Sequence, residues 1–136
     1  MKFLADSNVF IDFWHGKNLK QYTWIFTNHD VVLCGVVVAE LIQGAYSDKN
    51  KQRIQETLSL FEQVNLEDWE TFGQQLYALR KHGVTVPFQD AMIASIALKY
   101  NLPVWTNDKH FVRMQKAMPE LQLVTEEELC IGCYEV

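Results

Sequence analysis

The stretch that decides the fold is KFLADSNV, residues 2–9. Its first half, Lys2–Ala5, is short and apolar and ends at Asp6, which predicts a buried strand. The residues that follow, 8–15, place their aromatic side chains on one helical face and predict a helix. A buried strand followed directly by a helix is the unit from which parallel α/β sheets are built.

The alternation of strand and helix continues along the chain. Short apolar runs predict further strands at residues 31–34, 64–66, 103–106 and 121–124. Apolar residues at helical spacing predict helices at residues 19–27, 36–46, 54–61, 69–79 and 90–100. Because helical stretches separate most of the strands, the sheet should be parallel. The expected fold class is α/β, a three-layer α/β/α sandwich with a central parallel sheet.

Composition is typical of a globular protein. Of the 136 residues, 49% are hydrophobic and 21% are charged, which excludes a disordered or fibrous chain and predicts one domain over residues 1–136. No apolar run approaches the roughly 20 residues that span a bilayer, and Asp6 and Asp12 interrupt the first stretch too early for a secretory signal. The 3 cysteines, an odd number, favour free thiols in a reducing compartment. We therefore expect a cytoplasmic protein with no membrane partner.

The acidity of the chain is confined to its C-terminal tail. The formal net charge is −5, and residues 117–136 hold five acids without any Lys or Arg, so the remainder carries 12 acids and 12 bases. An acidic protein is a poor passive coat for nucleic acid. A nucleic-acid enzyme with its acids gathered in one site is still compatible with this charge.

Four acids should meet at one edge of the predicted sheet. The C-terminal ends of parallel strands all lie at the same edge, and Asp6 and Asp108 closely follow two of the strands. Glu40 lies about one turn into the helix after the second strand. Asp90 opens the helix that leads back to the fourth strand, so its N-terminus lies at that edge too. This is the edge at which α/β folds bind ligands.

Other acids do not satisfy this condition. Asp30 precedes its strand and Asp48 follows a helix, so both belong to the opposite edge, and Asp12 lies on a helix surface. Four clustered carboxylates need a counter-charge to remain ionised. Oxygen-rich anionic sites suit Mg²⁺ or Mn²⁺, and their characteristic chemistry is attack of water on a phosphodiester.

The segments that carry the four acids resemble the motifs of a known family. They read DSNV at 6–9, VAEL at 38–41, DAMIA at 90–94 and TND at 106–108, with His110 and Phe111 behind the last. In this order and with these gaps, the sequence resembles the PIN domain over essentially the whole chain. Its length is similar to that of the VapC-type toxins of bacterial toxin–antitoxin pairs. The resemblance implies a PIN-like fold and a metal-dependent endoribonuclease that cleaves cellular RNA, with tRNA and rRNA as candidate targets.

The resemblance also implies roles for individual residues. The four acids would bind one or two Mg²⁺ ions, with Mn²⁺ as the alternative: Asp6, Glu40, Asp90 and Asp108. Their polar neighbours would orient the carboxylates or the attacking water: Ser7, Asn8, Thr106 and Asn107. His110 stands where members commonly carry a further acid. The resemblance further implies a homodimer that is silenced by a small cognate antitoxin protein.

Two groups of residues allow two interpretations each. Basic side chains follow the last acid and either contact RNA phosphates or form a solvated surface: Lys109, His110, Arg113 and Lys116. Aromatic side chains of the first two helices belong either to the core or to an apolar groove for an antitoxin segment: Phe13, Trp14, Trp24 and Phe26.

Several other interpretations remain open. Asp6 and Asp90 are also placed to cap the helices that follow them, and Asp108 to form a turn. Without a second CxxC, Cys130 and Cys133 fit a loose tail or an edge strand near a dimer contact better than a zinc or redox site. The histidines outside the motifs are expected at the surface: His15, His29 and His82.

Alternative functions can be compared with the same motifs. A phosphatase of the haloacid-dehalogenase type needs an Asp where Asn8 stands, and a nicotinamide-binding domain needs a GxGxxG that is absent from the sequence. A PIN nuclease outside a toxin–antitoxin pair remains an alternative. So does a degenerate PIN fold that serves as a binding module.

Overall fold

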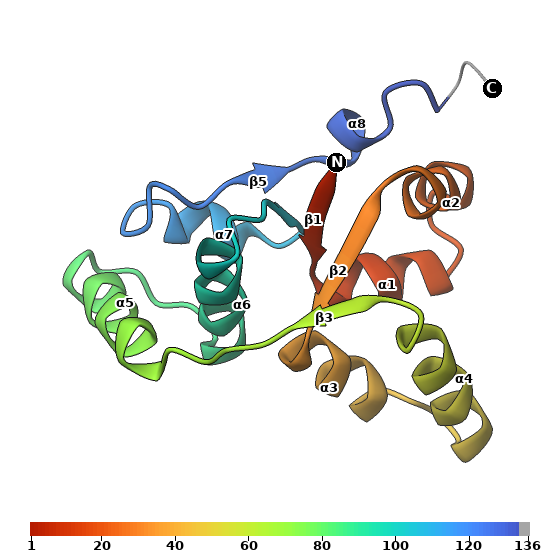
Figure 1. The fold of residues 1–136 in the computed structure, drawn as a ribbon, viewed down its shortest axis with the longest axis horizontal. Coiled ribbons are helices and arrows are strands. Elements are labelled where there is room, and N and C mark those ends of the chain that lie inside the picture. Colours follow the sequence, from red (N-terminus) through yellow and green to blue (C-terminus); the bar gives the residue numbers. More distant parts are fainter. Residues whose placement is uncertain (134–136) are drawn as a thin grey trace.

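A five-stranded parallel sheet forms the centre of the molecule (Figure 1). The computed structural model describes residues 1–133. The strands are β1 Lys2–Ala5, β2 Asp30–Cys34, β3 Glu62–Val64, β4 Val104–Trp105 and β5 Leu123–Val124. Their order is β3-β2-β1-β4-β5, and every neighbouring pair is parallel. β1 is therefore the central strand, in which Leu4 pairs with both Val32 and Val104.

Helices cover both faces of this sheet, as expected for a three-layer sandwich. They are α1 Ser7–Trp14, α2 Leu19–Asn28, α3 Gly35–Gln43, α4 Asp48–Leu58, α5 Trp69–Lys81, α6 Phe88–Lys99, α7 Lys109–Met114 and α8 Glu126–Leu129. The chain steps from β1 to β3 in one direction along the sheet and from β3 to β5 in the other. Right-handed crossovers then place α1–α4 and α5–α7 on opposite faces, and Figure 1 shows α1 and α2 across the strands from α5 and α6. No helix within residues 1–133 is long and apolar enough to cross a bilayer.

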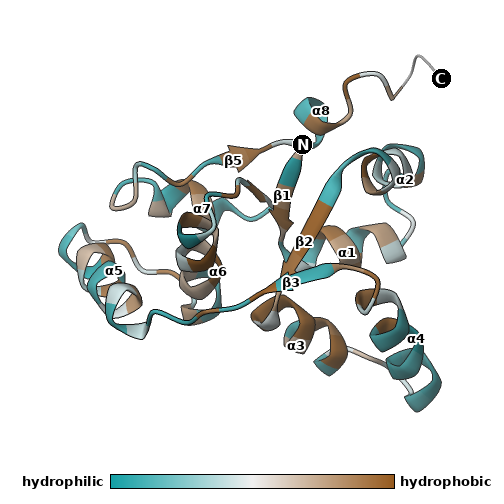
Figure 2. Ribbon diagram, in the orientation of Figure 1, coloured by the Kyte–Doolittle hydropathy of each residue, from teal (hydrophilic) through white to brown (hydrophobic). Residues whose placement is uncertain are grey.

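The core is packed around aromatic rings on the central strands. Trp105 is fully buried, and its ring lies edge-on to Phe3 and Tyr22 at centroid distances of 5.6 and 5.2 Å. Figure 2 shows α3 as hydrophobic over most of its length, whereas α4 is mostly hydrophilic. The acid Glu40 is thus carried by a helix most of whose hydrophobic side chains lie in the core or pack against it.

The predicted strands and helices are confirmed, with shifted ends. α3 ends at Gln43 and is followed by Gly44, and α4 ends at Leu58 although Phe61 continues the apolar spacing. Two short helices were not predicted, α7 and α8, because six and four residues offer too little periodicity to recognise.

The C-terminal segment is not a loose tail as far as Cys133, so that expectation was wrong. Leu129, Cys130 and Cys133 are buried, and the two cysteines lie in turns after α8 rather than in an edge strand. His29, expected at the surface, is partly buried, and its Nε2 lies 2.7 Å from the carbonyl oxygen of Leu129. Asn18 donates a hydrogen bond to Glu126 at 3.2 Å. Residues 134–136, the end of the predicted acidic tail, lie outside the described part of the chain.

Candidate active site

The end of β1 delivers Asp6 into a nearly closed environment. The side chain is only 3% exposed, and it caps α1 by accepting the Ser7 N–H at 2.7 Å through Oδ1. Its other oxygen accepts the Thr106 hydroxyl at 2.7 Å. Burial raises the pKa of Asp6 to about 6, with smaller contributions from the charges of Asp90 and Asp108, although the two hydrogen bonds oppose the rise. Asp6 is thus both a helix cap and an energetically costly buried acid.

Thr106, just after β4, links two of the acids. Its hydroxyl donates to Asp6 and accepts the backbone N–H of Asp108 at 2.9 Å. Asp108 in turn caps α7, because its Oδ1 accepts the backbone N–H of His110 at 2.9 Å. The turn residue that the sequence offered as an alternative is therefore a helix cap whose carboxylate lies beside the other acids.

Asp90 lies in the first turn of α6 but does not cap it. The helix begins two residues earlier, at Phe88, after Pro87, and its N-cap makes no side-chain hydrogen bond. The capping interpretation of Asp90 is therefore wrong. Its Oδ2 lies 2.8 Å from Nδ1 of His110. Burial and the charge of Asp108 raise the pKa of Asp90, while the contact with His110 lowers it.

Glu40 approaches the other acids from α3. Burial raises the pKa of Glu40, the charges of Asp6 and Asp90 raise it further, and the Ser7 side chain lowers it. Its Oε1 is buried and has no hydrogen-bond partner. An acceptor left unpaired in this way costs about 1–3 kcal/mol, so a ligand that supplies positive charge here would relieve a real penalty.

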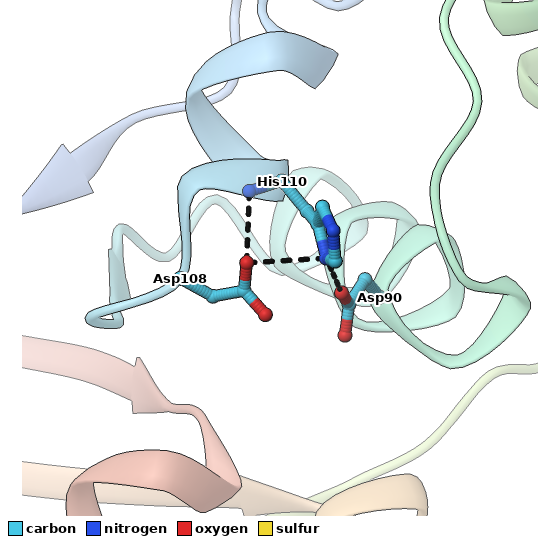
Figure 3. A group of neighbouring side chains, drawn as sticks. All are labelled: Asp90, Asp108 and His110. Carbon is cyan, nitrogen blue, oxygen red and sulfur yellow. Dashed lines mark hydrogen bonds and ion pairs between the residues drawn. The ribbon is translucent and has the colours of Figure 1, made fainter.

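The structure brings the four predicted acids into one electrostatic group. Each of Asp6, Glu40 and Asp90 has its pKa raised by the charge of at least one of the others or of Asp108. One oxygen of Asp90, one of Asp108 and a ring nitrogen of His110 all lie within 4.8 Å of one another (Figure 3). A set of carboxylate oxygens with one unpaired, buried member fits a hard divalent cation.

The predicted polar neighbours divide into two kinds. Thr106 and Ser7 interact directly with the acids, as described above. Asn8 and Asn107 instead connect the loop after β4 to the helices: Asn8 Oδ1 accepts the Asn107 N–H at 3.3 Å, and the Asn107 amide donates to Asp12 at 3.0 Å and to Tyr22 at 3.2 Å. Within residues 1–133, no hydrogen bond joins Asn107 to any of the four acids.

Sequence reasoning missed two features of this site. Asp12 was placed on a helix surface away from the site, yet it is a partner of Asn107, and no local pattern signals that contact. His110 was grouped with the basic residues and set at the position of a further acid, but its contact was not predicted: the ring lies between two of the four acids. The other three basic residues, Lys109, Arg113 and Lys116, are exposed. No ion pair joins them to an acid within residues 1–133.

A parallel sheet with the carboxylates of four segments gathered at one edge places the molecule among α/β domains with an acidic ligand-binding edge. More specifically, the chain belongs to the PIN-domain family, whose sequence model matches residues 3–117. The expected PIN-like fold is thereby confirmed.

Relatives and solved structures extend this assignment. Ribonuclease VapC1 of Methanocaldococcus jannaschii is 28% identical over 118 residues, which cover 85% of this chain and 82% of that protein. Ribonuclease VapC of Rickettsia bellii is 26% identical in an alignment 136 positions long, which covers 92% of this chain and 96% of the relative. A chain of the DNA-bound VapBC complex of Salmonella typhimurium matches with a TM-score of 0.76 at 24% identity, covering 93% of this chain and 98% of the other.

Proposed function

We propose that this chain is a Mg²⁺-dependent endoribonuclease that cleaves cellular RNA in the cytoplasm as the toxin of a toxin–antitoxin pair. The observation that carries the proposal is the convergence of four carboxylates from four segments at one edge of a PIN-family sheet. The two relatives described above are both named ribonucleases, which supports the choice of reaction and substrate class.

The metal would be held by the four acids, with Mn²⁺ able to replace Mg²⁺. A bound divalent ion would supply Lewis acidity toward the phosphodiester and lower the pKa of a coordinated water. The chain's own contribution is to fix the ligands. Thr106 and the Ser7 N–H each hold one oxygen of Asp6, both at 2.7 Å. Glu40 presents an oxygen that has no protein partner and is therefore available.

Substrate RNA would approach along α7. Lys109 and Arg113 are exposed on this helix, and Lys116 follows it, so three cations lie close in sequence to Asp108. Contacts with phosphates would position the backbone without selecting a base sequence. Cleavage would leave a 5′-phosphate and a 3′-hydroxyl.

A cognate antitoxin would cover the apolar surface along α1. A cavity of about 380 Å³ extends from Glu40 past Ile11 and Trp14 to Tyr46. Trp14 also lines a second cavity of about 240 Å³ that is walled by Phe10, Phe13, Phe26 and Phe61. An amphipathic segment laid along both cavities would bury these side chains and reach the acids. The VapBC complex among the structural matches supports a partner of this kind.

A second copy of the chain would cover another exposed surface. Trp69, Tyr77 and Phe88 are more than half exposed on α5 and at the start of α6. Exposed aromatic side chains on two adjoining helices are typical of protein interfaces. We expect a homodimer, which light scattering on the purified protein would detect as twice the mass of the chain.

Cleavage of purified cellular RNA, tRNA and rRNA included, is the test of the proposed function. The folded protein, freed of antitoxin, should produce discrete cuts in Mg²⁺ that disappear with EDTA and in the Asp90→Asn variant. Mapping the cut ends would identify the target. Specific RNA binding without cleavage in Mg²⁺ or Mn²⁺ would instead indicate a PIN fold that serves as a binding module.

A further inference from the structure

The ring of His110 occupies an unusual place for a basic residue of a surface helix. Its Nδ1 lies 2.8 Å from Oδ2 of Asp90 and 3.1 Å from Oδ1 of Asp108 (Figure 3). Both neighbouring atoms are hydrogen-bond acceptors, and they come from different elements, α6 and the residue that caps α7. The space between the three atoms therefore suits a positive charge.

The fold fixes the position of this ring. His110 is the second residue of α7, and its backbone N–H is bound by the carboxylate of Asp108 at 2.9 Å. The next residue, Phe111, is fully buried and anchors the same turn in the core. The side chains of His110 and Asp108 remain about one-third exposed, at 34% and 31%. The ring is thus held on a rigid turn, while an ion can enter from solvent.

We propose that Nδ1 of His110 is a cation ligand together with Asp90 and Asp108, so that this centre is a mixed nitrogen and oxygen site that favours Mn²⁺ over Mg²⁺. The inference rests on the proposed function, because it concerns the metal of the same site. It assigns His110 to the metal centre rather than to a phosphate-binding patch.

The distances favour coordination. Ligand atoms that share one small divalent ion, each about 2.1 Å from it, lie within about 4.2 Å of one another. The three atoms here already lie within 4.8 Å, so small side-chain movements suffice. The other ring nitrogen, Nε2, has no hydrogen-bond partner within residues 1–133. It can carry the ring proton toward solvent, which leaves the Nδ1 lone pair free for an ion.

The choice of metal follows from ligand chemistry. Mg²⁺ takes oxygen ligands and gives up its water reluctantly. Mn²⁺ accepts carboxylates equally well and, as a first-row transition ion, also accepts imidazole nitrogen. An imidazole in place of a third oxygen therefore shifts the preference of the site from Mg²⁺ toward Mn²⁺.

Pulsed electron paramagnetic resonance of Mn²⁺ bound to the RNA-free protein tests this directly. We expect a ¹⁴N coupling from a directly bound ring nitrogen, replaced by a ¹⁵N coupling when the histidines alone are labelled with ¹⁵N. His110→Asp should abolish the coupling and lower the ratio of Mn²⁺ to Mg²⁺ affinity about tenfold. His15→Asn is the matched control, because His15 lines the cavity that reaches Glu40 and its loss should leave the coupling intact.

The outcomes separate the inference from the proposed function. Two results would overturn the role of His110: Mn²⁺ bound to the wild-type protein without a nitrogen coupling, or a coupling that survives in His110→Asp. Neither result would contradict the metal-dependent nuclease. A protein that binds neither ion but cleaves RNA in EDTA would overturn the metal centre altogether. Histidine labelling needs no substitution, so the test holds even where a variant fails to fold.

Discussion

The acids of the two sides of the site differ in how the protein holds them. Asp6 accepts two hydrogen bonds, and Asp90 and Asp108 both lie against His110. We call these three the held acids. Glu40 projects from α3 on the other side, and its buried Oε1 has no hydrogen-bond partner. Hydrogen bonds within the site thus fix three carboxylates, whereas Oε1 of the fourth has no such partner.

This difference shows how an acidic site can be assembled before its ligand binds. Hydrogen bonds to ionised carboxylates contribute about 1.5–3 kcal/mol each, which offsets part of the cost of burying the held acids. No such compensation is available to Oε1 of Glu40, so that part of the cost remains until a cation is bound. In the proposed metal site, the held acids would define where an ion sits, and the unpaired Oε1 of Glu40 would be stabilised by its positive charge.

The largest expected effect comes from removing the charge of Glu40, the acid whose Oε1 has no hydrogen-bond partner. Glu40→Gln should lower Mg²⁺-dependent RNA cleavage by ~10³-fold, because one of the proposed metal ligands is lost. The unfolding free energy should not fall, since no hydrogen bond of Oε1 is broken. Single-turnover cleavage and urea unfolding measure the two effects.

The matched control for this variant is Glu67→Gln, which makes the same chemical change at an exposed position. Its cleavage rate should equal that of the wild type. A Glu40→Gln variant with full activity would show that the held acids suffice, and that the unpaired oxygen has no part in the reaction.

The sequence was sufficient to predict the fold class, the parallel sheet and the edge at which the four acids lie. These follow from strand periodicity and from the shared direction of parallel strands, which act over short stretches of chain. The contacts that distinguish held from unheld acids join residues far apart in sequence, such as Thr106 with Asp6. Side-chain direction decides such contacts, and the pattern of residue types contains no information on it. The contact of the His110 ring with two acids could not be predicted for the same reason.

The next effect concerns the free energy that burial of the ionised Asp6 costs the folded, metal-free protein. The folded-state pKa of Asp6, about 6, lies above its ordinary 3.8, so the folded form keeps this proton to higher pH than the unfolded form does. The contribution of the Asp6 carboxyl to the unfolding free energy is therefore greatest below about pH 4, falls as the pH rises toward 6 and stays low above pH 6. Asp6→Asn should raise the unfolding free energy by about 1–3 kcal/mol at pH 7.5.

Urea unfolding in EDTA at pH 4.5 and pH 7.5 measures this prediction. The gain from Asp6→Asn should be clearly larger at pH 7.5, and added Mn²⁺ should stabilise the wild type more than the variant. An equal gain at both pH values would mean that hydrogen bonding, and not charge, sets the energy of this position.

A smaller effect is expected from the group that holds the acids. Thr106→Val removes the hydroxyl that donates to Asp6 and accepts from the N–H of Asp108. We expect a loss of about 1–3 kcal/mol in unfolding free energy and a fall in cleavage of about 10- to 100-fold. Thr106→Ser keeps the hydroxyl and should retain most of the wild-type unfolding free energy and cleavage rate. A Thr106→Val variant that keeps the wild-type stability and cleavage rate would show that the hydroxyl does not hold the acids.

The smallest effect tests the packing that places Glu40. Gly35 begins α3, and its N–H donates to the Asn65 side chain at 2.9 Å, so a Cβ at this position would lie 2.6 Å from that oxygen. Gly35→Ala should lower the unfolding free energy by about 1–2 kcal/mol, because Asn65 must give up the hydrogen bond or α3 must shift with Glu40.

Gly73→Ala is the matched control, since nothing lies within 4 Å of its Cβ inside α5. It should raise the unfolding free energy by about 0.5–1 kcal/mol. In a double-mutant cycle, Asn65→Ala should relieve most of the added cost of Gly35→Ala, and strictly additive effects would show that this contact does not position the helix.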